Sequence, residues 1–163
     1  MDRIVKIAAL FAVIALAITL LGFLPQKKEL DIRNFSFASF VDPNLSYIPN
    51  TGYFRRSENI YFVFELANLE ARDGNVSYKV DAEITNISGE TPEKTFEQTI
   101  LEETRPVDNN RRIVSVAGKV NAAFGARLGT NRLKITVKDK FSGTTGAIEE
   151  AFSVVEWEKQ IID

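Results

Sequence analysis

A strict alternation of apolar and polar side chains constrains the fold of this chain more than any other feature. From Val76 to Thr85 every even-numbered residue is apolar and every odd-numbered residue is polar. A strand sends successive side chains to opposite faces, whereas a helix would scatter these apolar groups around its axis. The same period of two recurs in residues 60–67 and 132–138. The pattern therefore predicts half-buried β-strands.

Four weaker strand candidates complete the set, and turn-forming residues separate all seven. The weaker candidates are residues 33–41, 95–101, 111–120 and 147–157. Gly, Asn, Asp and Pro lie between them, as in Asp73-Gly74 and Ser142-Gly143. Seven short strands with almost no helical period predict an all-β fold in which two antiparallel sheets pack as a sandwich. Residues 121–128 are expected to form a short helical turn at a corner.

Residues 7–24 read IAALFAVIALAITLLGFL, a run without any charge. A helix of this length covers about 27 Å, which is close to the roughly 30 Å hydrocarbon core of a bilayer. Pro25 is expected to end the helix. We therefore expect residues 1–28 to form a leader and one transmembrane helix, and residues 29–163 to form one domain.

The basic leader contains Arg3 and Lys6, which favours a cytoplasmic N-terminus and an extracytoplasmic domain. Three other interpretations of the apolar run remain open. It resembles the apolar part of a cleaved signal peptide, a buried helix of a globular protein, or the N-terminal helix of a pilin-like filament subunit. A pilin usually has Gly or Ala after the basic residue, but here Ile7 follows Lys6.

Two segments resemble a known family of domains. Residues 128–140 (LGTNRLKITVKDK) resemble the penultimate strand of immunoglobulin-like and fibronectin-III-like extracytoplasmic domains, and residues 57–65 (SENIYFVFE) resemble their early core strand. The resemblance implies a seven-strand immunoglobulin-like sandwich over roughly residues 30–157. It implies a fold and no particular activity.

Composition excludes several classes of function. The chain has no Cys and no His, so it lacks disulfides, thiol nucleophiles, Cys/His zinc sites and histidine acid-base catalysis. Residues 29–163 carry a formal charge of −5, which disfavours binding to nucleic acid. We therefore expect a protein that is not an enzyme, has no cofactor and does not bind nucleic acid.

Without His and Cys, carboxylates are the main side chains left for acid-base catalysis or metal binding. Asp81 and Glu83 are two residues apart on one predicted strand, so they share a face and are candidates for acid-base work or cation binding. More often such a pair is simply part of the solvated face of a strand. Residues 73–75 and 108–110 have the composition of calcium loops without the spacing, so no metal ligand is assigned.

Two further sets of surface residues are candidates for modification or contact. Asn34, Asn44, Asn75 and Asn86 each begin an Asn-x-Ser triplet and are candidate glycosylation sites. Residues 47–56 combine turn formers, aromatics and arginines, a composition enriched at recognition surfaces. The candidate contact residues in this segment are Tyr47, Tyr53, Phe54, Arg55 and Arg56.

These observations together predict a single-pass membrane protein whose C-terminal domain is extracytoplasmic. The expected role is a protein-interaction or structural module of a cell-envelope assembly, with a protein partner in the envelope. Two alternatives stay open: a pilin-like filament subunit, and a carboxylate-dependent or cation-binding surface domain. The sequence does not identify the partner or the oligomeric state.

Overall fold

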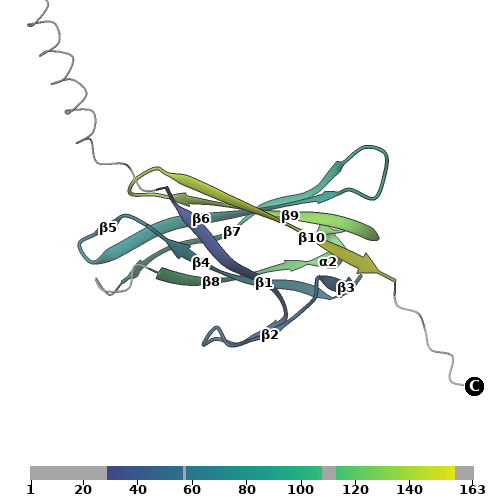
Figure 1. The fold of residues 1–163 in the computed structure, drawn as a ribbon, viewed down its shortest axis with the longest axis horizontal. Coiled ribbons are helices and arrows are strands. Elements are labelled where there is room, and N and C mark those ends of the chain that lie inside the picture. The colour runs from purple at the N-terminus through teal and green to yellow at the C-terminus, as the bar shows by residue number, and fades with distance from the viewer. Residues whose placement is uncertain (1–28, 57, 108–112, 157–163) are drawn as a thin grey trace, which may run out of the picture.

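The computed structural model describes residues 29–56, 58–107 and 113–156, and the chain is almost entirely β-structure there (Figure 1). The elements are β1 (Asp31–Val41), β2 (Tyr47–Pro49), β3 (Tyr53–Arg55), β4 (Asn59–Ala67), β5 (Ala71–Arg72), β6 (Asn75–Asn86), β7 (Glu93–Pro106), β8 (Ile113–Asn121), α2 (Ala122–Gly125), β9 (Gly129–Asp139) and β10 (Thr145–Val155).

The strands form two sheets. The first has four strands in the order β2-β1-β4-β8. The second has six strands in the order β3-β10-β9-β6-β5, and β7 also pairs with β6. The pairs are antiparallel except for β3 and β10, which run parallel. All-β structure, as predicted from the period of two, is therefore confirmed.

One hydrophobic core lies between the two sheets. The even-numbered residues of β4 and β6 point into it, so that Ile60 and Phe62 from one sheet share a cluster with Val80 and Ile84 from the other. Phe37 of β1 joins the sheets directly, because its ring lies 5.7 Å from that of Phe152 on β10. The alternation that predicted these strands thus also indicated correctly which of their faces is buried.

The expected strand count of seven was too low. All seven predicted segments contain strands, but β2, β3 and β5 were not predicted, because strands of two or three residues are too short to show a period. The prediction of exclusively antiparallel pairing was also wrong, since β3 and β10 are parallel. The short helix α2 lies within the predicted helical turn.

The predicted leader and transmembrane helix, residues 1–28, lie outside the described residues. Within the part of the chain that the structure does describe, no helix has the length and apolar character needed to cross a membrane.

The described chain enters and leaves the domain at opposite ends (Figure 1). Leu30 lies against Gly146 at the start of β10, where an added Cβ would come within 2.9 Å of the Leu30 carbonyl oxygen. Val154, near the other end of β10, pairs with Phe54 of β3. Eight residues of strand separate Gly146 from Val154, which is about 26 Å. We call the two ends the entry end and the far end.

Candidate contact site

The predicted contact segment, residues 47–56, crosses from one sheet to the other. Its first part is β2, which pairs with β1 at the edge of the four-stranded sheet. Its last part is β3, which pairs with the end of β10 in the six-stranded sheet. Its β3 part therefore lies at the far end of the domain, and the segment is held by strands of both sheets.

Asn50 fixes the turn between β2 and β3. Its side-chain oxygen accepts hydrogen bonds from the backbone N–H groups of Gly52 and Tyr53 at 2.8 and 3.0 Å. Its amide nitrogen donates to Ser39 Oγ and to the Tyr53 carbonyl oxygen, each at 3.2 Å. Gly52 is buried with φ of +83°, a conformation that glycine adopts readily. The turn presents its neighbours to solvent in one defined conformation.

The five candidate contact residues are in different environments. Tyr47 and Tyr53 are 42% and 64% exposed, as a contact surface requires. Phe54 is only 2% exposed, and its ring packs against Phe37 and Phe152 in the core. A partner docking on this surface would therefore meet the tyrosines, while Phe54 holds β3 in place.

The two arginines are exposed and paired with carboxylates. Arg55 forms an ion pair with Glu58, with Nε and Oε1 3.9 Å apart. Arg56 Nη1 lies 3.3 Å from Glu156 Oε1, which ties β3 to the end of β10. These pairs leave little net charge at the far end of β3.

An open hollow of about 630 Å³ lies beside β3. Tyr53, Arg55, Tyr61 and Val155 contribute to its walls, together with Ser39 and Asn50 from the turn and the end of β1. No hydrogen bond involves the hydroxyl of Tyr53 or of Tyr61 among the described residues. The hollow presents the phenol side chains of Tyr53 and Tyr61 to a partner surface.

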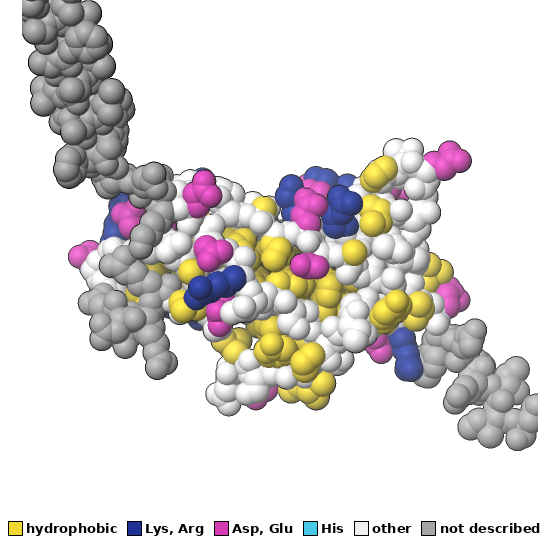
Figure 2. All heavy atoms as spheres, in the orientation of Figure 1, with side chains coloured by type: hydrophobic (Ala, Val, Ile, Leu, Met, Phe, Trp, Pro, Cys, Tyr) yellow, Lys and Arg dark blue, Asp and Glu magenta, His cyan; other side chains and the backbone are white. Residues whose placement is uncertain are grey.

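Sequence reasoning missed Phe40 and Ile48. These residues are cross-strand partners on β1 and β2 and are 52% and 61% exposed. Figure 2 shows hydrophobic side chains gathered over the hairpin of β1 and β2. The signal that would have found Ile48 is the absence of charge from residue 43 to residue 54, in a chain in which 26% of residues are charged. We call residues 43–54 the uncharged stretch.

Asp81 and Glu83, the candidate acid-base pair, both have cationic partners. Asp81 accepts hydrogen bonds from Lys79 and from Thr99 Oγ1, and Glu83 Oε2 lies 2.6 Å from Lys94 Nζ. Partial burial raises the pKa of Asp81, but these hydrogen bonds outweigh it and hold the pKa below its ordinary value. The hydrogen bond from Lys94 lowers the pKa of Glu83. Both groups are thus ionised at neutral pH, which leaves neither as a proton donor.

No cluster of three or more Asp, Glu, His or Cys side chains suited to a metal ion occurs among the described residues. Residues 73–75 form the tight turn between β5 and β6, where Asp73 and Gly74 have positive φ and Asn75 Nδ2 donates to the Asp73 carbonyl oxygen. Residues 108–110 lie outside the described residues.

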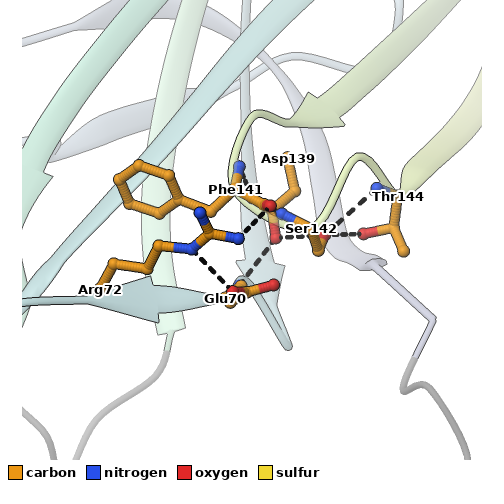
Figure 3. Close-up of polar contacts among 6 residues, drawn as sticks. All are labelled: Glu70, Arg72, Asp139, Phe141, Ser142 and Thr144. Carbon is orange, nitrogen blue, oxygen red and sulfur yellow. Dashed lines mark hydrogen bonds and ion pairs between the residues drawn. The ribbon is translucent and has the colours of Figure 1, made fainter.

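The most heavily bonded carboxylate is Asp139, which sequence reasoning did not identify (Figure 3). It is fully buried at the end of β9 and accepts hydrogen bonds from four donors. These are the backbone N–H groups of Glu70, Phe141 and Ser142, and the Ser142 hydroxyl. Arg72 closes the arrangement, bonding to the Glu70 carboxylate and the Phe141 carbonyl oxygen. The cluster joins the β9–β10 turn to the segment around β5.

The four Asn-x-Ser sites differ in how their side-chain nitrogens are engaged. Asn34 Nδ2 donates to Glu65, and Asn75 Nδ2 donates to the Asp73 carbonyl oxygen. Asn86 Nδ2 has three acceptors at the far end of the domain. Asn44 is exposed, and its side chain makes no hydrogen bond within the described part of the chain. Asn44 is thus the site whose amide would be modified without breaking a contact.

Comparison with known proteins gives matches among solved structures alone. No protein-family model and no curated protein matches the chain. Among solved structures, the DNA glycosylase AlkC of Pseudomonas fluorescens, bound to DNA with an abasic site analogue, has a TM-score of 0.47 at 11% identity. A β-glucosidase of Listeria innocua in complex with glucose has a TM-score of 0.43 at 9% identity.

These similarities cover 77% of this chain in both cases, but only 30% of the glycosylase and 16% of the glucosidase. A β-glucosidase of intestinal bacteria involved in saponin metabolism gives a TM-score of 0.41 at 10% identity, over 80% of this chain and 17% of the enzyme. At such values the matches carry no argument about what this chain does.

The resemblance to immunoglobulin-like and fibronectin-III-like domains was wrong. The matching structures described above are a DNA glycosylase and β-glucosidases, and none of them is described as a domain of either family. The alternating motifs on which the resemblance rested, in residues 57–65 and 128–140, fit any half-buried strand beside a turn, so they could not specify a family.

Proposed function

We propose that this protein is a membrane-anchored, extracytoplasmic module that acts by contact, as an interaction or structural part of a cell-envelope assembly. The observation that carries the proposal is the distribution of exposed hydrophobic side chains. Seven large hydrophobic residues are exposed among those that the structure describes. Four of the seven lie between residues 40 and 53: Phe40, Tyr47, Ile48 and Tyr53.

An exposed apolar patch on a stretch of chain without charged side chains is typical of a protein-protein interface. The outer face of the six-stranded sheet has the opposite character. There Glu83 pairs with Lys94, and Glu149 pairs with both Arg132 and Lys134. Such a ladder of ion pairs is suited to water. The contrast between the two surfaces supports docking at the contact segment.

The anchor is inferred from the uncharged run of residues 7–24. The first described residues lie at the entry end, about 26 Å from β3 by the length of β10. With residues 7–24 in a bilayer, β3 would lie at the end of the domain away from the lipid, where a partner in the envelope can reach it.

Site-specific photo-crosslinking in native membranes tests this function. A photoreactive phenylalanine analogue replaces Tyr47 in the full chain, and the adducts are identified by mass spectrometry. We expect a discrete protein adduct that survives high salt, because an apolar contact is little screened. Adding Ile48→Ser should reduce its yield several-fold.

The matched control carries the same analogue at Lys138, an exposed position of β9 on the charged face. This position should give no such adduct. Equal labelling from both positions, or a yield that Ile48→Ser leaves unchanged, would contradict a specific contact at β2. Adducts formed only with other copies of this chain, together with regular fibres by electron microscopy, would favour the filament subunit instead.

A further inference from the structure

The six-stranded sheet has an open edge along most of β10. β3 covers this edge only at Ser153, Val154 and Val155. From Thr145 to Ala151, no strand of the described chain pairs with it. β1 runs beside the edge but is not one of its hydrogen-bonded neighbours. Unpaired N–H and C=O groups in such a row are a template for a strand of another molecule.

Apolar side chains lie next to this open edge. Ile32, Phe35 and Ile148 are only partly buried and pack against the core from β1 and β10. Figure 2 shows hydrophobic side chains at the surface in the middle of the face along which these two strands run. A strand added to β10 would cover them, so the hydrophobic effect favours such an addition.

Glu150 occupies a core-facing position of this edge strand. Its cross-strand partner on β9 is Leu133, which is 1% exposed and belongs to the core. Cross-strand partners share a face, and the inward-facing Ile148 and Phe152 flank Glu150 along β10. Glu150 is nevertheless exposed, and it forms no ion pair among the described residues. The alternation predicts an apolar residue here, and the chain has a carboxylate.

We infer that Glu150 keeps the open edge of β10 closed to a strand from a second copy of this chain. A second β10 paired with this edge would cover the partly buried apolar groups and enclose the Glu150 carboxylate with them. Removing an unpaired charge from water is unfavourable. Inward-pointing charges are one of the devices by which natural sheets protect their edges.

The neighbouring Glu149 is a control that distinguishes the position of the Glu150 carboxylate from the effect of negative charge alone. Glu149 points to the opposite face of the sheet, where it forms ion pairs with Arg132 and Lys134. It lies on the same free edge and carries the same charge, but an added strand would not bury it against the core. The inference is independent of the proposed function, since it concerns the edge of β10 from Thr145 to Ala151 and not the uncharged stretch.

Disulfide trapping in the full, detergent-solubilised chain tests the inference. The chain has no Cys, so Ala147→Cys gives a single reporter on an exposed position of β10. The reporter is combined with Glu150→Val or with Glu149→Val, and disulfide-linked dimer is measured on non-reducing gels over a range of protein concentrations. We expect several-fold more dimer with Glu150→Val, and the level of the reporter alone with Glu149→Val.

A dimer fraction unchanged by Glu150→Val, or raised equally by Glu149→Val, overturns the inference. Circular dichroism establishes that each variant retains its β-structure. If Glu150→Val does not fold, Glu150→Gln decides the matter, because it removes the charge at constant size. Glu150→Gln should also raise the dimer fraction, and no rise would overturn the inference.

Discussion

At the scale of the residue, the buried carboxylate of Asp139 shows how one side chain can hold two separate parts of the chain together. All four of its hydrogen-bond donors are neutral, and three of them are backbone N–H groups. Three donors come from the β9–β10 turn and one from Glu70, which is 69 residues away in sequence. The carboxylate can stay buried there because its oxygens are satisfied by hydrogen bonds.

We predict that Asp139→Asn lowers the free energy of unfolding by about 3 kcal/mol, because the new NH₂ group faces backbone donors and leaves at least one of them unsatisfied. Chemical denaturation measures the effect. Asp73→Asn is the matched control, since Asp73 is exposed in a turn with positive φ that Asn also tolerates. The control should change stability by less than about 0.5 kcal/mol. Equal losses in both variants would contradict the role given to Asp139.

Sequence reasoning separated exposed from buried residues in the candidate contact segment only in part. Tyr47 and Tyr53 are exposed as predicted, but Phe54 belongs to the core, because a three-residue strand has too few positions to show which face is buried. Asp139 had a readable signal. It follows Leu133, Ile135 and Val137 at the next core-facing position of β9, where an acidic residue requires buried partners. The sequence could not show which groups donate hydrogen bonds to Asp139, because one of them, the Glu70 N–H group, is 69 residues away.

At the scale of the element, the length of β7 was the largest error. Residues 95–101 were predicted, whereas the strand extends over fourteen residues from Glu93 to Pro106. Two register shifts against β6, between Val80 and Asp81 and between Ile84 and Thr85, interrupt the alternation. Each shift changes which residue faces the core, so the period of two fails although the strand continues. Strands with one unbroken register, such as β6 with β9, were predicted well.

The ion pairs between β6 and β7 give a pH prediction. The hydrogen bond from Lys94 keeps the pKa of Glu83 below its ordinary value of about 4.3. Lys94→Met should therefore raise the pKa of Glu83 toward that value, as measured by NMR titration of the side-chain carboxyl carbon. Lys119→Met is the control, because Lys119 is exposed on β8 and forms no ion pair within the described residues. It should leave the pKa of Glu83 unchanged.

The sign of the accompanying change in stability follows from linkage. A carboxyl group whose pKa is lowered by folding stabilises the native state above its unfolded-state pKa, and this contribution is lost as the pH falls through the folded-state pKa. Lys94→Met should thus be less stable than the parent protein at neutral pH, and the difference should disappear in acid. A difference that persists after Glu83 is protonated would show that Lys94 acts through packing.

At the scale of the whole molecule, one aromatic cluster makes the two sheets a single cooperative unit. Phe37 lies between them, with its ring centroid 5.0 Å from that of Phe35, 5.6 Å from Phe54 and 5.7 Å from Phe152. These residues come from β1, β3 and β10, so neither sheet can lose its strands without exposing the other. The cluster also connects the core to the base of the contact segment.

Phe37→Ala should therefore lower the free energy of unfolding of the whole domain by about 3 to 5 kcal/mol. Circular dichroism and tyrosine fluorescence should report one coincident transition at a lower denaturant concentration. Phe40→Ala, on the same strand but 52% exposed, should change stability by less than about 0.5 kcal/mol. Separate transitions for the two probes would show that the sheets unfold independently.

The entry of the chain beside Gly146 and its exit after Val155 have a mechanical consequence. Tension applied between the two termini would act along β1 and β10, parallel to the strands. β10 is paired with β9 over ten successive residues, and all of these pairs would have to slide together instead of opening one by one. A domain built in this way transmits a pull along its length and resists extension until the whole ladder shears.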